Sequence, residues 1–164
     1  MRVIGIDPGY AIVGYGIVDY SNNSFKTVCY GAIRTEAGIP FDQRLLKISD
    51  NLEKLFKRFN PDSMSIEKLF FTSNQKTVID VSQARGVIVV TAAKYGIPVF
   101  EYTPLQVKQS VVGYGRAEKR QVMEMTKMML GLKTIPKPDD AADALAVAIC
   151  HSHTSSSLIT DIRS

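Results

Sequence analysis

The sequence predicts an α/β fold built on a mixed five-stranded sheet, which begins as an antiparallel β-meander, continues with parallel strands and is flanked by helices. Three observations carry this prediction. Strand patterns over residues 2–7, 12–20 and 25–33 are joined by short turn signals. A helical pattern follows at residues 41–59. A strand, helix, strand order then spans residues 62–102, which is typical of a right-handed parallel crossover.

The size and composition of the chain indicate one globular domain. Its 164 residues are 45% hydrophobic and 22% charged, unlike those of a disordered or fibrous protein. We expect a single domain over residues 1–153 and a disordered polar tail over residues 154–164. There is no signal peptide or long apolar run, and Cys29 and Cys150 lack the spacing of a metal or redox motif. The expected location is the reducing cytoplasm, with no membrane as a partner.

The first predicted strand ends at a carboxylate. Residues 3–6 are apolar on both faces apart from one glycine, as in a buried strand. Pro8 cannot donate to a sheet ladder and Gly9 tolerates positive φ, so the chain turns directly after Asp7. The pattern fits a functional carboxylate at Asp7, and it equally fits an aspartate that only caps its own turn.

A second strand repeats this arrangement. Met64 and Ile66 point inward from a strand over residues 62–67, and Glu67 ends it. The loop that follows contains Phe70, which by default anchors in the core. At a loop tip beside a nucleic acid, such a phenylalanine can instead stack on a base.

The segment 41–59 is predicted to be an amphipathic helix, because its apolar residues are spaced alternately by four and three. Leu46 and Phe56 lie off the main stripe and widen the apolar face. This surplus packs on the sheet in the simplest interpretation and meets a second subunit in the alternative. Further helices are predicted over residues 76–95 and 104–112.

A glycine-hinged loop and a basic helix start follow residue 112. Together, Lys108, Arg116, Lys119 and Arg120 can line a track for DNA phosphates. The glycine spacing matches neither a Walker A loop nor a dinucleotide-binding fingerprint. The alternative is a plain solvated surface, which is the commoner reason for such a run of charge.

The last predicted helix, over residues 138–151, begins with carboxylates. Asp140 and Asp143 are three residues apart and therefore project from one face of its first turns. Capping alone favours an aspartate near a helix N-terminus, but Asp143 lies deeper, among alanine and leucine. We discount His151 and His153 as a zinc pair because no cysteine arrangement partners them.

Four carboxylates thus come from two strand ends and one helix start: Asp7, Glu67, Asp140 and Asp143. Two like charges about 4 Å apart repel by about 4 kcal/mol at an effective dielectric constant of about 20, so gathering these acids requires a bound cation. All-oxygen ligands favour Mg²⁺, or Mn²⁺ in its place, over Zn²⁺. Two such ions in one site can hydrolyse a phosphodiester. The rest of the chain has twenty Lys and Arg against twelve Asp and Glu, which suits a polyanionic substrate.

Several groups of residues, taken in order, resemble the motifs of one known family. They are Gly5-Ile6-Asp7-Pro8-Gly9, Ile66-Glu67-Lys68-Leu69-Phe70, Gln83-Ala84-Arg85-Gly86, Val107-Lys108-Gln109 with Gly113 and Ala117-Glu118-Lys119, and the run from Asp140 to Ala146. Over residues 1–153 this combination is similar to RuvC, the bacterial Holliday-junction resolvase family. The combination is far more specific than any single motif.

The resemblance implies a ribonuclease H-like fold and a homodimer that nicks two strands of a four-way DNA junction symmetrically, with Mg²⁺, in homologous recombination and DNA repair. It also implies cooperation with the RuvA–RuvB branch-migration complex. Carried over by motif, the four carboxylates are the catalytic metal ligands, Phe70 stacks near the crossover, and Lys108 and Lys119 contact phosphate. Asp139 leaves open which acid meets the metal, although spacing favours Asp140.

Two cuts at symmetric positions in a junction call for two active sites related by a twofold axis. The helix over residues 41–59 is the candidate contributor to the dimer interface, and Leu52→Asp is expected to disrupt the dimer. A Leu52→Asp variant that stays dimeric in light scattering contradicts this assignment.

Other functions stay open at this point. Another ribonuclease H-like nuclease, acting on RNA, shares carboxylates at its strand ends. A sugar-kinase or actin-like nucleotide-binding module also ends its first strand in an Asp-x-Gly turn, but it requires a duplicated domain and a much longer chain. A non-catalytic junction-binding protein is disfavoured, because four acids oppose purely electrostatic binding of DNA.

Overall fold

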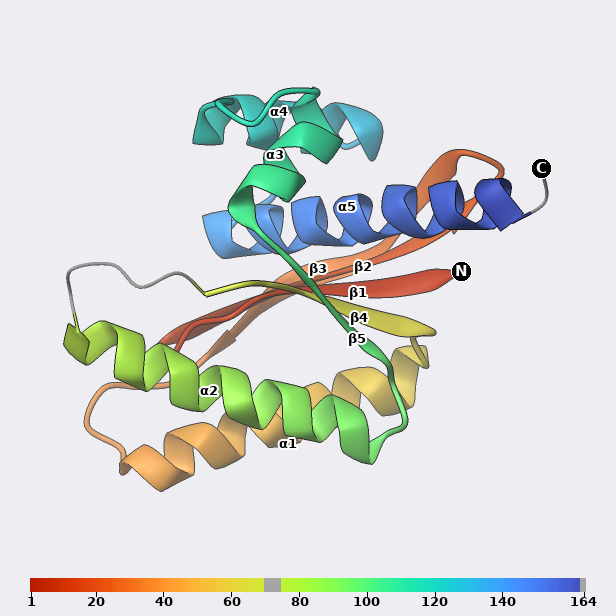
Figure 1. The fold of residues 1–164 in the computed structure, drawn as a ribbon. Helices are drawn as coiled ribbons and strands as arrows, with labels where there is room; N and C mark the ends of the chain where they lie inside the picture. Colours follow the sequence, from red (N-terminus) through yellow and green to blue (C-terminus); the bar gives the residue numbers. More distant parts are fainter. Residues whose placement is uncertain (70–74, 163–164) are drawn as a thin grey trace.

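The computed structural model describes residues 1–69 and 75–162. Five strands form one mixed sheet in the order β3-β2-β1-β4-β5 (Figure 1). The strands are β1 (Arg2–Asp7), β2 (Ile12–Ser21), β3 (Ser24–Arg34), β4 (Ser63–Glu67) and β5 (Val99–Tyr102). The first three pair antiparallel, β4 pairs parallel with β1, and β5 pairs parallel with β4. The predicted α/β class, the meander and the parallel crossover are confirmed.

Helices cover both faces of the sheet (Figure 1). One face is covered by α1 (Phe41–Phe59) and α2 (Gln75–Lys94), and the other by α5 (Asp139–Ile162). Two shorter helices, α3 (Pro104–Val112) and α4 (Lys119–Met129), pack on the outer side of α5. Among the helices in the described ranges, none combines the length and the apolarity that a membrane span needs.

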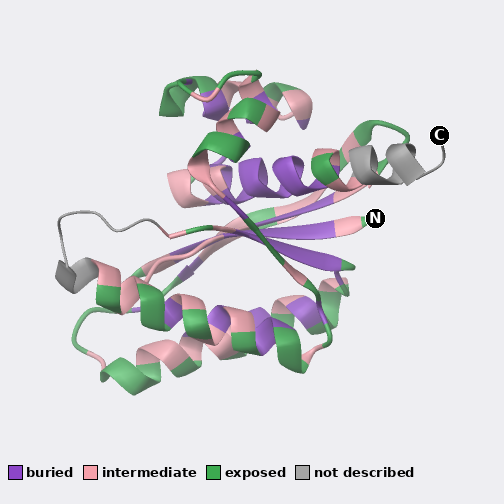
Figure 2. Ribbon diagram, in the orientation of Figure 1, coloured by how far each residue is buried: buried purple, intermediate pink, exposed green. Residues whose placement is uncertain are grey.

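The alternation of side chains along the strands divides the core into two layers. Ile4, Ile6 and Ile17 are fully buried against α1 and α2, whereas Val3 and Val18 are buried against α5. Figure 2 shows buried residues along the strands and on the helix faces that contact them. The sheet is therefore covered on both faces at its centre, and functional groups are confined to its ends and edges.

The apolar stripe of α1 faces the sheet, so one expectation about this helix is wrong. Leu52 has 0% of its surface exposed, and Ile48 and Phe56 are buried beside it. A carboxylate at position 52 would lie unpaired in the core, so Leu52→Asp disrupts folding rather than an interface. Of the two residues that widen the stripe, Phe56 is buried and Leu46 is 51% exposed.

Glycines on the strands let α5 lie directly against the sheet. A Cβ atom on Gly5 would overlap the carbonyl oxygen of Ala144, and one on Gly14 would overlap that of Asp140. The alanines of α5 complete this close approach, because Ala144 and Ala148 are fully buried. The first turns of α5 are thereby held against the start of β2, beside the end of β1.

The structure continues α5 to Ile162, beyond the predicted helix end at residue 151 and into the segment expected to be a disordered tail. Hydroxyl side chains near the end of the predicted helix bond within the helix. Ser152 Oγ donates to the carbonyl of Ala148 and Thr154 Oγ1 to that of Cys150, each at 2.9 Å. Serine and threonine indicated a loop in the sequence, but bonds to the preceding turn accommodate these residues in a helix.

Candidate active site

Asp7 and Glu67 leave the sheet side by side. Ile6 pairs with Ile66 in the parallel ladder of β1 and β4, so the next residue of each strand lies at the same carboxyl edge. The chain after Glu67 is held in place because the Lys68 amide donates to the Tyr102 carbonyl at 2.8 Å. Two rigid strands thus place the first two predicted carboxylates.

The start of α5 supplies the other two acids. Asp140 is in its first turn and Asp143 lies one turn deeper. The adjacent Asp139 points elsewhere, because its Oδ1 accepts from Lys137 Nζ at 2.7 Å. Asp140 is one of the three acids whose negative charge acts on Asp7, whereas Asp139 is not. The preference for Asp140 over Asp139 therefore has structural support.

Burial and mutual repulsion dominate the electrostatics of this cluster. Burial is the largest cause that raises the pKa of Asp7 from its ordinary 3.8 to about 8, followed by the charges of Asp143, Glu67 and Asp140. Burial and then Asp143 also raise the pKa of Glu67. Asp7 and Glu67 therefore resist ionisation, and a cation bound beside them would favour their charged forms.

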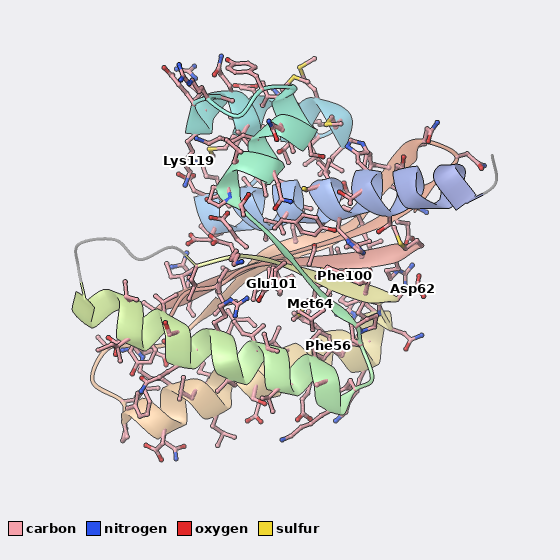
Figure 3. The ribbon with its side chains drawn as sticks, in the orientation of Figure 1. Phe56, Asp62, Met64, Phe100, Glu101 and Lys119 are labelled. Atoms are coloured by element: carbon pink, nitrogen blue, oxygen red, sulfur yellow. The ribbon has the colours of Figure 1, made fainter. Side chains whose placement is uncertain are left out.

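Two lysines face these acids. Lys119 Nζ donates to Asp143 Oδ2 at 2.8 Å, and this bond raises the pKa of Lys119. Figure 3 labels Lys119 between α4 and the start of α5. The positive charges of Lys119 and Lys108 both act on Glu67. Lys108 and Lys119 line a pocket of about 200 Å³ together with Glu67 and Asp143. The rest of its wall is apolar: Pro104, Val107, Val122 and Ala146. The pocket therefore combines acids, cations and a poorly hydrated wall.

The donor set fits a hard divalent cation, because every donor is a carboxylate oxygen. Within residues 1–69 and 75–162, however, no three acidic, histidine or cysteine side chains converge tightly enough to form a finished metal site. Lys119 also occupies one oxygen of Asp143. Metal binding therefore requires these side chains to draw together.

The other residues predicted to contact DNA lie in different places relative to the pocket. Phe70 lies outside the described residues. Arg116 and Arg120 are both exposed on the loop before α4 and at its start, and neither is among the residues that line the pocket. Lys108 and Lys119 do line it.

His151 is a structural residue, in agreement with its rejection as a zinc ligand. The buried ring lies between Ser63 Oγ, 3.0 Å from Nε2, and the Tyr102 hydroxyl, 2.7 Å from Nδ1. It also stacks on Phe100, with 4.4 Å between ring centroids. Burial lowers the pKa of His151, which favours the neutral ring.

Sequence reasoning assigned Lys119 to phosphate and missed its bond to Asp143. The two residues are 24 positions apart, and they meet only because α4 packs on α5. The sequence signals this contact only through the opposite charges of the two residues. Opposite charge does not single out one pair among the many lysines and acids of the chain.

Comparison with known proteins decides the family. The sequence model described as crossover junction endodeoxyribonuclease RuvC matches residues 3–151, a range that contains all four acids. The chain belongs to the RuvC family. RuvC from Ruminiclostridium cellulolyticum is 60% identical over 154 residues, which are 94% of this chain and 93% of that protein. RuvC from Caldanaerobacter subterraneus is 54% identical over 158 residues, 96% of each chain.

A solved RuvC structure has the same fold. The structure of Thermus thermophilus RuvC in complex with a Holliday junction substrate superposes with a TM-score of 0.90, covers 94% of each chain and is 34% identical. The mixed sheet with helices on both faces is the ribonuclease H-like fold of RuvC.

Proposed function

We propose that this RuvC-family protein resolves Holliday junctions by paired symmetric nicks, as a structure-selective endodeoxyribonuclease of homologous recombination and DNA repair. The observation that carries the proposal is the placement of two acids at adjacent parallel strand ends, beside two acids from the start of α5. The activity in the family's name, crossover junction endodeoxyribonuclease, agrees with what such a set of acids can do to a phosphodiester.

The four acids, Asp7, Glu67, Asp140 and Asp143, are proposed to hold two divalent ions, Mg²⁺ with Mn²⁺ as a substitute. When held by these acids, such ions would supply activation of a water and neutralisation of the charge on the leaving oxygen. Asp7 and Glu67 are fixed by strands, and Asp140 and Asp143 by a helix seated on the sheet. Burial disfavours the charged form of Asp7. A cation bound beside it would offset this effect and favour the ionised form.

Basic residues are proposed to bind the DNA backbone. Lys108 and Lys119 line the pocket and can bind the phosphate that is cut. For Lys119 this requires release from Asp143. Arg116 and Arg120 are exposed next to them and can extend the positive surface along the strand. The apolar wall excludes water from one side of the reacting phosphate.

A homodimer is proposed through the outward face of α2. Exposed positions recur along this helix at spacings of four and three: Ile79, Gln83, Gly86, Val90 and Ala93. Ile79 and Val90 are 58% and 55% exposed. A Cβ atom on Gly86 would meet no described atom within 4 Å, apart from the backbone of its own helix. Glycine in an exposed helix lowers the stability by about 1 kcal/mol relative to alanine. Close approach of a second helix would explain why glycine occupies position 86.

We propose that α1 still contributes to the dimer interface, but through fewer residues than its apolar stripe predicted. Leu45 and Ser49 of α1 line a groove of about 430 Å³ together with Gly86 and Val90 of α2. A second copy of the chain can cover this groove, so α1 takes part through Leu45 rather than through Leu52.

The remaining partners follow from the proposed substrate. A resolvase that acts on chromosomal junctions is expected to work in the cytoplasm of a bacterium and to cooperate with the RuvA–RuvB branch-migration complex. Stacking of Phe70 near the crossover stays a prediction.

Cleavage of three substrates tests the proposal. A labelled four-way junction, a linear duplex and an RNA–DNA hybrid are each incubated with the protein in Mg²⁺ and in EDTA. We expect paired nicks in the junction only, and only with Mg²⁺. Cleavage of the RNA hybrid in preference to the junction supports the RNA nuclease instead. Binding of the junction without cleavage in Mg²⁺ supports a non-catalytic recognition protein.

A further inference from the structure

We propose that a second pocket, between β3 and α1, binds the sugar-phosphate backbone of a duplex arm of the DNA. The pocket has a volume of about 220 Å³ and is lined by Tyr15, Ala32, Ile33, Arg34, Lys47, Asn51, Lys54 and Leu55. None of these residues lines the pocket that contains Glu67 and Asp143. The inference rests on the proposed function, because that function supplies DNA as the ligand of this pocket.

The charge of this pocket is strongly one-sided. Three of its lining residues are cations, Arg34, Lys47 and Lys54, and none is acidic. Glu36 reaches Lys47 Nζ from outside the lining, at 2.7 and 2.8 Å. In the described part of the chain, Arg34 and Lys54 take part in no ion pair or side-chain hydrogen bond. Two cations are therefore available to a ligand.

The pocket is built into the fold and is more than a group of surface lysines. Tyr15 pairs with Gly31 across β2 and β3, and a Cβ atom at position 31 would lie 2.8 Å from the Tyr15 hydroxyl oxygen. The missing side chain lets the ring lie across β3, so that Tyr15 forms part of the wall. A further cation, Arg58, is near enough for its charge to act on Tyr15. The Tyr15 hydroxyl also bonds with Cys29, and tyrosine is one of the side chains that contact phosphates in protein–DNA complexes.

The position of the pocket selects DNA as the occupant. Asp7 pairs with Gly14, and Gly14 pairs with Ala32, so the end of β3 lies at the catalytic end of the sheet. Two strand spacings separate Asp7 from Ala32, which is about 10 Å. The pocket lies on the α1 face of the sheet and Asp7 on the α5 face, so the path between them runs around this end of the sheet and is longer than about 10 Å. Phosphates follow one another at about 3.4 Å along the axis on each DNA strand, so an arm that passes this end of the sheet can reach both places within several nucleotides. An acidic protein lacks this fixed relation to the catalytic site.

The test compares two double variants that remove the same charge. Arg34→Gln with Lys54→Gln neutralises the pocket. Lys26→Gln with Lys133→Gln is the control, because both lysines are exposed and Lys26 lies at the opposite end of β3. Fluorescence anisotropy without Mg²⁺ measures the affinity for a junction and for a linear duplex over a series of salt concentrations. Circular dichroism confirms that both variants fold.

We expect the pocket variant to bind both DNAs more weakly than wild type, most clearly at low salt. Its plot of log affinity against log salt should be less steep by about 2, one for each phosphate that the variant no longer neutralises. The control variant should change this slope by less than half as much as the pocket variant does. Equal slopes for the two variants overturn the proposal. A wild type that binds DNA but cuts no junction contradicts the proposed function, and the binding result still decides the role of the pocket.

Discussion

The two aspartates that begin α5 show how single side chains are assigned. Asp139 is paired with Lys137 at 2.7 Å, and its side chain is half exposed. Asp140 instead adds to the negative charge around Asp7, and its backbone is held against Gly14. Neighbours in the sequence therefore have different environments, and of the two only Asp140 acts on Asp7.

Asp140→Asn is expected to lower junction cleavage by at least about 100-fold, because it removes a proposed metal ligand. Asp139→Asn is the matched control and should stay within a few-fold of wild type, since its exposed ion pair contributes little. Single-turnover cleavage in Mg²⁺ measures both. A larger loss for Asp139→Asn than for Asp140→Asn contradicts the assignment.

The half-buried Asp7 also predicts how the stability of the metal-free protein depends on pH. Its pKa is raised from 3.8 to about 8, so between these values the folded protein holds a proton that the unfolded chain has lost. The free energy of unfolding should therefore fall as the pH rises from about 4 to about 8, by up to a few kcal/mol. Glu67, whose pKa is also raised, acts in the same direction.

Thermal unfolding in EDTA at several pH values measures this effect. The melting temperature of wild type should fall over this range relative to that of Asp7→Asn, which cannot ionise. Excess Mg²⁺ should reduce the fall, because the ion binds the folded, ionised form. Parallel curves for wild type and Asp7→Asn in EDTA would falsify the account of Asp7.

At the scale of elements, helix spacing was the most reliable signal. The helix predicted over residues 41–59 has the bounds of α1, because its stripe is regular and Asn60 with Pro61 ends it. The predicted end of the last helix at residue 151 was wrong, because α5 continues to Ile162 and its Ser152 and Thr154 hydroxyls bond to the preceding turn. The stripe of α1 also could not reveal whether it faces the sheet or a second chain, and the burial of Leu52 decides for the sheet.

The outward face of α2 gives a prediction about assembly. Val90→Asp should convert the proposed dimer to a monomer, because it places a charge at the centre of an apolar contact. Met128→Asp on α4 is the control, since Met128 is 68% exposed and α4 lies on the other side of the sheet. Light scattering of both folded variants measures the outcome. A dimeric Val90→Asp variant excludes α2 as the interface.

For the whole molecule, the sequence predicted that four acids lie at the ends of strands and at a helix start, but not how the surrounding side chains meet them. Asp7 and Glu67 could be recognised because each ends a buried strand, and a parallel ladder then places them together. The contact of Lys119 with Asp143 depends on how α4 packs over α5, which no local pattern encodes. The same holds for the basic pocket, where Arg34 and Lys54 come from separate elements. Long-range packing therefore accounts for most of what the sequence left open.

The most direct test of the catalytic cluster is junction cleavage by Asp7→Asn in Mg²⁺, with junction binding measured in parallel. Asp62→Asn is the control, because Asp62 is exposed and lies before β4, at the strand end opposite Glu67. The account predicts that Asp7→Asn binds the junction as wild type does and cuts it at least about 100-fold more slowly, while Asp62→Asn does both normally. Cleavage by Asp7→Asn at a rate near that of wild type contradicts the account.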